Sequence, residues 1–135
     1  MTVRENIIDA LRAKIESLNI KTGIWTTRKI TEEDCPYLDI RDVSCSYDNE
    51  SSNGLSFNSL SLRLTLYDVG TDVHRKLRDN VAAIYQALGE DQTLGGLADY
   101  IRLDGDEFDI EQHERLIGVA GIDITVFYKT AEFAI

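Results

Sequence analysis

The clearest hydrophobic pattern in the chain is a helical one near its middle. Five apolar residues recur at steps of three or four and therefore share one helix face: Val73, Leu77, Val81, Ile84 and Leu88. Thr71 is placed to act as the N-cap, and Gly89 follows the last apolar position, where a glycine commonly ends a helix. A helix with one apolar face needs a sheet to cover, so strands are expected around it.

Alternating patterns on both sides of this helix predict those strands. Four leucines alternating with polar residues predict the clearest one: Leu60, Leu62, Leu64 and Leu66. In the strand expected at 37–47 the apolar positions change parity near Asp42, which predicts a β-bulge or a twist there. Further strands are predicted at residues 24–30, with Trp25 as an anchor, at 99–103 and at 116–128.

With a first amphipathic helix at residues 4–18, the expected order is α-β-β-β-α-β-β. The sequence therefore predicts an α+β fold, in which two helices pack on an antiparallel sheet of about five strands. The 135 residues suit a single domain, with residues 131–135 as a C-terminal arm. A strand over 116–128 would extend about 43 Å, against about 35–40 Å for a compact domain of this size. Either Gly118 and Gly121 bend this strand, or its hairpin projects beyond the core.

Composition narrows the function classes. The formal net charge of −10 argues against binding to a phosphate backbone, which needs a basic surface. Two cysteines, Cys35 and Cys45, are too few for a disulfide framework and match no zinc spacing. Residues 1–6 do not resemble a signal peptide, and no apolar run approaches the roughly 20 residues that span a bilayer. A cytoplasmic setting is expected.

Candidate catalytic and metal-binding patterns are weak. The histidines His74 and His113 have no motif that pairs them with a cysteine nucleophile. Residues 104–114 are strongly acidic, but a calcium loop beginning at Asp104 lacks the required residues at its fifth, sixth and twelfth positions. The sequence favours a solvated connection between strands for this segment, and a tight turn for Gly95-Gly96. No cofactor or metal site is predicted.

Charge clusters and the C-terminus supply the candidate subunit-interface residues. The one basic cluster lies in the first turns of the central helix, where positive charge opposes the helix dipole: His74, Arg75, Lys76 and Arg78. Its candidate partner in a neighbouring copy is the acidic segment, with Asp104, Asp106, Glu107 and Asp109. A solvated face is the alternative for both. Phe133 and Ile135 follow the last strand with nothing left in the sequence to cover them.

The chain resembles the tail terminator (tail completion, or minor tail) proteins of long-tailed bacteriophages. The resemblance covers nearly the whole chain as a pattern of elements, from the opening helix to the final strand. It includes a strand opened by Pro36, the leucine-alternating strand and the central helix. Two short motifs carry the local similarity, namely Asp91-Gln92-Thr93-Leu94-Gly95-Gly96-Leu97 and the ending Val126-Phe127-Tyr128-Lys129-Thr130.

The resemblance implies a structural protein that carries out no catalysis. Such a subunit would assemble with itself into a ring, usually a hexamer, on the tail tube protein, stop tube polymerisation and present a surface to the head–tail connector protein. It would act at the head-proximal end of the virion tail, after assembly in the host cytoplasm. The alternatives are a head–tail connector or neck subunit and, from another class, a small metal-dependent enzyme using the carboxylates near Asp104.

Overall fold

The computed structural model describes residues 2–49, 54–112 and 116–134. It confirms the predicted fold class, with two helices, a five-stranded and mostly antiparallel sheet, and the expected element order. The elements are α1 (Val3–Glu16), β1 (Lys21–Ile24), the 3-10 turn η1 (Glu32–Asp34), β2 (Tyr37–Asp48), β3 (Leu55–Val69), α2 (Val73–Glu90), β4 (Tyr100–Gln112) and β5 (Leu116–Ala131). Neither helix in these ranges has the length and apolar character needed to cross a membrane.

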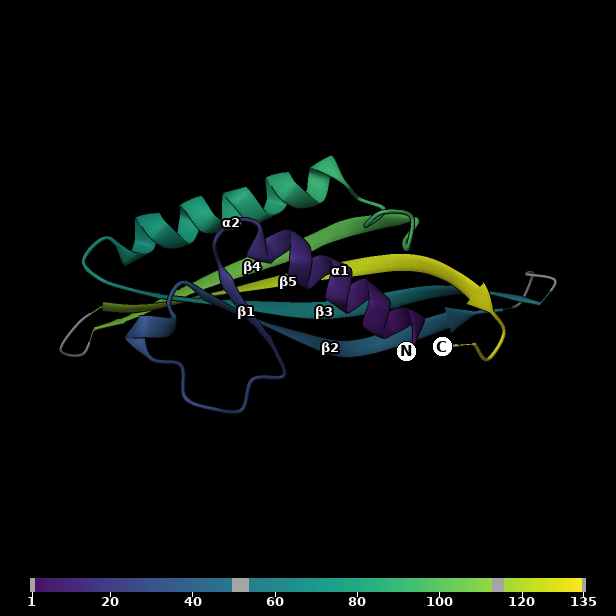
Figure 1. Ribbon diagram of the computed structural model, residues 1–135, viewed down its shortest axis with the longest axis horizontal. Helices are drawn as coiled ribbons and strands as arrows, with labels where there is room; N and C mark the ends of the chain where they lie inside the picture. Colours follow the sequence, from purple (N-terminus) through teal and green to yellow (C-terminus); the bar gives the residue numbers. More distant parts are fainter. Residues whose placement is uncertain (1, 50–53, 113–115, 135) are drawn as a thin grey trace.

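The strands lie in the order β1-β2-β3-β5-β4, and only β1 and β2 are parallel. Both helices pack on one side of the sheet, which we call the inner face (Figure 1). The connection between β1 and β2 contacts the opposite, outer face, where the Thr26 hydroxyl hydrogen-bonds the Tyr37 hydroxyl at 2.8 Å. Within the described residues, no helix covers the outer face over β3, β5 and β4 (Figure 1).

The core lies between the inner face and the two helices. It contains the four leucines of β3 together with five apolar residues of α2, as the alternating and helical patterns predict: Leu60, Leu62, Leu64, Leu66, Val73, Leu77, Val81, Ile84 and Leu88. Helix α2 approaches β5 so closely that a Cβ atom added at Gly118 would lie 2.5 Å from Leu77 Cδ1. Gly118 therefore sets the separation between this helix and the sheet.

The β-bulge predicted near Asp42 is confirmed. The pairing of β2 with β3 shifts register between Asp42 and Ser44, and the intervening Val43 is exposed. Before the shift, Leu38 and Ile40 face the core, and after it Cys45 does so. The change of apolar parity in the sequence marks this irregularity because one extra residue moves every later side chain to the other face.

The strand predicted at residues 24–30 is wrong. The first strand is Lys21–Ile24, which continues almost directly from α1, and the following residues form a loop held by side-chain contacts. Trp25 is 49% exposed and is not a core anchor. Its indole Nε1 donates to Asp42 at 2.7 Å, and the Arg41 guanidinium lies 5.0 Å from its ring centroid. Trp25 therefore lies at the surface beside β2 and not in the core.

Both predicted ends of the central helix need correction. Its N-cap is Asp72 rather than Thr71, and no side-chain hydrogen bond caps it. The helix also continues through Gly89 to Glu90. The chain reverses only in the next turn, where Leu94, Gly95 and Gly96 have positive φ angles. Paired glycines therefore provide the turn before β4, as the sequence predicts.

The acidic segment is part of a strand, which corrects the expected solvated connection. Strand β4 continues to Gln112, with a register shift between Leu103 and Gly105 against β5. Strand β5 pairs with β3 without interruption, so neither Gly118 nor Gly121 breaks its pairing. Figure 1 shows β5 curving along the molecule, and β2, β3 and β5 running beyond the helices at the end where β5 finishes.

Candidate functional site

The predicted basic cluster lies in the first half of α2, and the structure divides it between two sides of the helix. The Lys76 ammonium donates to the backbone carbonyl of Val69 at 3.1 Å, toward the turn that precedes α2. At about 3.6 residues per turn, Arg78 lies on the opposite side, in line with Tyr85. Arg75 and Arg78 are exposed, and neither forms an ion pair with another described residue.

Three of the four predicted acidic residues have partners within the chain. Asp104 accepts hydrogen bonds from Arg102 at 2.6 Å and Thr125 at 2.5 Å. The bond from Thr125, followed by that from Arg102, holds the pKa of the Asp104 carboxyl below its usual range. Asp106 accepts from Tyr85 at 2.5 Å. The Glu107 carboxylate lies 3.5 Å from a guanidinium nitrogen of Arg63.

Asp109 differs from these three, because it contacts no charged or polar partner in the described part of the chain. The pairing of Asp109 with Val119 of β5 places its side chain on the outer face of edge strand β4. The structure therefore does not bring the acidic and basic clusters together within one molecule. No group of three or more histidine, cysteine or acidic side chains within residues 2–49, 54–112 and 116–134 is arranged to hold a metal ion.

The outer face carries an aromatic strip, which we define as Phe57, Phe127 and Tyr100 on the adjacent strands β3, β5 and β4. The Tyr100 and Phe127 rings stack with their centroids 4.4 Å apart. Arg102 lies over Phe127 at 5.2 Å, and Lys129 lies over Phe57 at 5.7 Å. Phe57 and Tyr100 are 42% and 47% exposed, so the strip presents a large apolar surface with cations beside it.

Sequence reasoning missed this strip as a unit. Each ring occupies an outward position that the alternation predicts, but only the register across three strands makes the rings neighbours. Tyr100 pairs directly with Phe127, and Phe57 pairs with Lys129, two residues further along β5. The one available signal was that Phe57 and Phe127 sit on the otherwise polar side of apolar strands. Exposed aromatic side chains on such a face are typical of protein interfaces, in which aromatic residues are enriched.

The C-terminal arm begins where β5 ends. The Glu132 amide donates to the Gly54 carbonyl at 2.9 Å, and the Ala134 amide donates to the Ala131 carbonyl at 3.1 Å. Phe133, in the left-handed region at φ 61°, is 94% exposed, so the predicted exposure of this residue is confirmed. Ile135 lies outside the described residues. The arm's backbone is fixed to the sheet while its aromatic side chain contacts almost nothing.

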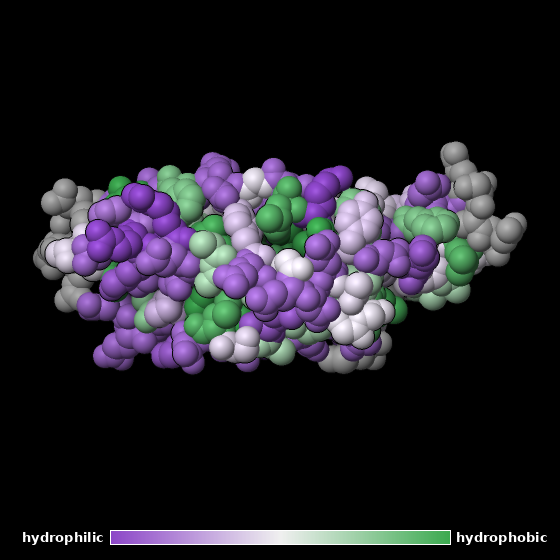
Figure 2. Space-filling model, turned by 90° about the horizontal axis from the view of Figure 1, so that it is seen from above, coloured by the Kyte–Doolittle hydropathy of each residue, from purple (hydrophilic) through white to green (hydrophobic). Residues whose placement is uncertain are grey.

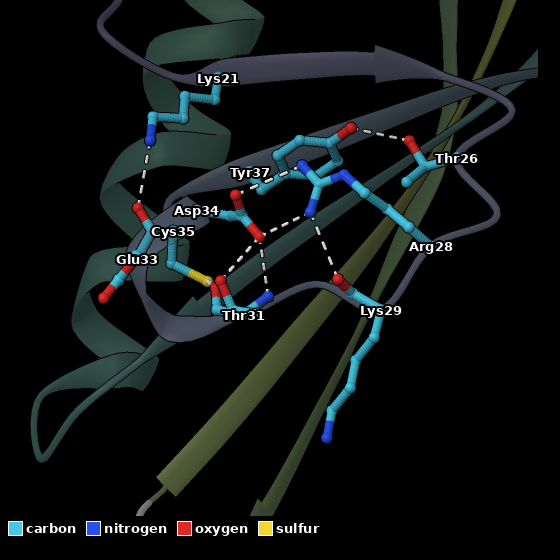
Figure 3. A network of polar contacts seen from close by, with 9 residues as sticks. All are labelled: Lys21, Thr26, Arg28, Lys29, Thr31, Glu33, Asp34, Cys35 and Tyr37. Carbon is cyan, nitrogen blue, oxygen red and sulfur yellow. Dashed lines mark hydrogen bonds and ion pairs between the residues drawn. The ribbon is translucent and has the colours of Figure 1, made fainter.

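The loop between β1 and β2 covers part of the outer face through a polar network (Figure 3). Arg28 donates to Asp34 at 2.8 Å, and its guanidinium lies 5.4 Å from the centroid of the Tyr37 ring. The hydrogen bonds from Arg28 and then from Thr31 hold the pKa of the Asp34 carboxyl far below its usual range. Figure 3 shows Arg28, Asp34 and Thr31 pointing toward one another, so this loop has a defined shape.

The cysteines show no sign of nucleophilic chemistry. Cys35 donates to the Thr31 carbonyl at 3.6 Å, and burial raises the pKa of its thiol. Cys45 lies 3.7 Å from the Tyr128 hydroxyl, whose pKa burial raises to about 12. Neither sulfur hydrogen-bonds His74, and His113 lies outside the described residues. Burial therefore favours the protonated form of the Cys35 thiol, which is the less nucleophilic one.

Comparison with known proteins adds no assignment: no family model matches the chain, and no curated protein matches it. A function for this chain therefore has to be inferred from the surfaces described above.

Proposed function

We propose that this protein is a tail terminator subunit of a long-tailed bacteriophage or prophage, which assembles on the tail tube and provides the surface for head joining. The observation that carries the proposal is the aromatic strip on the sheet face that no helix covers. Three rings and two flanking cations on neighbouring strands form a surface that suits a protein partner. The resemblance of the chain to tail terminators supplies the identity of that partner.

The proposed role needs a surface complementary to that of the tail tube and no catalysis. A tube subunit polymerises because each ring exposes a surface that accepts the next ring. A terminator must match this surface and offer no further copy of it. The strip would supply apolar contact area at the centre of such an interface, while a net charge of −10 would keep the free subunits soluble. The tail tube protein and the head–tail connector are the proposed partners, and assembly is proposed to give a ring, usually a hexamer.

Deleting the gene from the phage that carries it tests the proposal. We expect unfinished or overlong tails that are separate from filled heads, and purified protein should restore joining without added nucleotide or metal. Tails of normal length that lack heads would instead indicate a connector or neck subunit. Normal tails joined to filled heads would contradict both roles.

Substitutions in the strip test the observation behind the proposal. Phe57→Ala combined with Tyr100→Ala should abolish complementation of the deletion while the purified variant still folds, since both rings are half-exposed. Val43→Ala is the matched control, because Val43 is an exposed apolar residue on the β2 bulge, away from the strip. If the double variant complements as well as the control, the strip is not the contact surface.

A further inference from the structure

Strand β4 is the outermost strand of the sheet, and its free edge is next to an incompletely covered apolar row. Phe108 pairs with Ala120 and Ile110 pairs with Gly118, so both side chains lie on the inner face beside α2. They are nevertheless 43% and 40% exposed. Figure 2, which looks onto the helices, shows hydrophobic residues in separate patches between hydrophilic ones. A long open edge with apolar side chains is a surface on which another chain can pack.

Opposite charges flank this row and cannot meet within one molecule. The hydrogen bond from Tyr85 to Asp106 shows that the side of α2 that carries Tyr85 faces β4. Arg78 lies two helical turns earlier, about 10.5 Å toward the start of α2. Along a strand, that distance is about three residues. The start of α2 lies over Gly118, the partner of Ile110, and from this spacing we infer that Arg78 is at about the height of Asp109.

Although they are level, these two residues lie on opposite sides of the sheet. Arg78 belongs to the helix on the inner face, whereas Asp109 is on the outer face of β4. Each has no ion-pair partner among the residues that the structure describes. Although the chain has a net charge of −10, no described acidic residue pairs with Arg78, and the helix dipole opposes a positive charge in the first half of α2.

We propose that the β4 edge binds the β4 edge of a second copy of this chain, across a two-fold axis parallel to the strand. Rotation about such an axis leaves the height along the strand unchanged and exchanges the two sides of the sheet. Arg78 of each copy then faces Asp109 of the other, twice in one contact. On each side of the joined sheets, Phe108 and Ile110 of one copy then lie next to the outer face of the partner's β4, which reduces their exposure to water.

The charges also select against the other symmetric arrangement. A two-fold axis perpendicular to the sheet would place the β4 strands of the two copies side by side and antiparallel, so that they form one continuous sheet. The helices of both copies would then lie on the same side of that sheet. The outer-face carboxylates of Glu107 and Asp109 would then lie beside those of the partner, and like charges at an interface oppose association. The pairing proposed here concerns the free chain in solution and does not rest on the tail terminator role.

The test is sedimentation velocity of the purified full chain at low ionic strength, with single charge reversals. Wild type should form a dimer that salt weakens. Arg78→Glu and Asp109→Lys should each weaken dimerisation by roughly tenfold or more, because each change occurs twice in the contact and replaces attraction by repulsion. An equimolar mixture of the two variants should restore dimers, since Glu at position 78 then faces Lys at position 109.

Matched controls separate this contact from the effect of overall charge. Lys29→Glu changes the net charge from −10 to −12, as Arg78→Glu does, at an exposed loop position. Asp9→Lys matches Asp109→Lys on the exposed side of α1. Both controls should dimerise like wild type. If a reversal unfolds the chain, Arg78→Gln and Asp109→Asn replace it and should weaken dimerisation to a smaller extent.

Three results would overturn the proposal. The first is a wild type that stays monomeric at the highest soluble concentration, and the second is a mixture of reversed variants that does not recover dimers. The third is a salt-sensitive ring or polymer in place of the dimer, because that would require a head-to-tail contact instead of a two-fold one.

Discussion

Leu64 is the residue whose truncation tests the core most directly. It lies in the middle of β3 and is completely buried. The sheet register places Ile40 of β2 on one side of it and Ile122 of β5 on the other, and both of these side chains are completely buried too. Leu64 belongs to the core cluster that also contains the buried residues of both helices. Leu64→Ala therefore removes atoms from a place that has packed neighbours on every side.

The expected loss follows from two contributions. Deleting about three methylene equivalents costs about 2.4 kcal/mol of transfer free energy, at roughly 0.8 kcal/mol each. The cavity adds to this because two neighbouring strands, held by backbone hydrogen bonds, cannot move inward to fill it. We therefore expect the free energy of unfolding to fall by about 2–5 kcal/mol.

Urea denaturation followed by circular dichroism measures the loss, with Thr65→Ala as the matched control. Thr65 is the next residue along β3 and faces the outer side, so its truncation should change stability by less than about 1 kcal/mol. A loss below about 1 kcal/mol for Leu64→Ala would show that the leucine face is not the core. An equal loss in both variants would show that strand propensity and not burial is being measured.

Two further predictions concern the C-terminal arm and the loop on the outer face. Phe133→Ala should weaken assembly but leave the free energy of unfolding within about 0.5 kcal/mol of wild type, because the ring is 94% exposed. Deletion of residues 131–135 should weaken assembly and also lower thermal stability, because it removes the pairing of Ala131 with Leu55. The lowered pKa of Asp34 means that its contribution to stability is present above the unfolded pKa of about 3.9 and is lost as the pH falls through the folded value. Arg28→Ala should therefore reduce the acid sensitivity of the loop, measured by Trp25 fluorescence between neutral pH and pH ~2.

The elements that the sequence predicts well are those with one buried face. In β3 and α2 the apolar period alone determines the element, and the β2 bulge is visible because the period changes parity at Asp42. Strand β4 was missed beyond Leu103 because an edge strand has a free side. There Glu107 and Asp109 alternate with Phe108 and Ile110, and the charges resemble those of a loop.

Contacts that depend on register could not be predicted at all. The aromatic strip exists because β3, β5 and β4 align Phe57, Phe127 and Tyr100 within two residues of one another. The sequence did identify Arg78 and Asp109 as members of opposite charge clusters. It could not show that the two residues lie on opposite sides of the sheet, because it predicted a solvated connection at residues 104–114 and not a strand. In such a connection Asp109 would have had no fixed side.

Two glycines give opposite predictions for the same substitution, and together they test how α2 sits on the sheet. At Gly118 an added Cβ atom would lie 2.5 Å from Leu77 Cδ1 and 2.6 Å from Val73 Cγ2. Both of these residues are completely buried, so they have no free space to move into. Gly118→Ala must therefore lift the start of α2 from β5 and should cost about 1–3 kcal/mol, as overpacked cores do.

Gly89 is the matched control, because it lies inside α2 with nothing within 4 Å of an added Cβ atom. Gly89→Ala should stabilise the protein by up to about 1 kcal/mol, since alanine loses less backbone entropy in a helix than glycine does. Urea denaturation of both variants gives the comparison. If Gly118→Ala is as stable as wild type, the helix does not rest on this glycine. If Gly89→Ala is destabilised, the helix ends before residue 89, as the sequence alone had suggested.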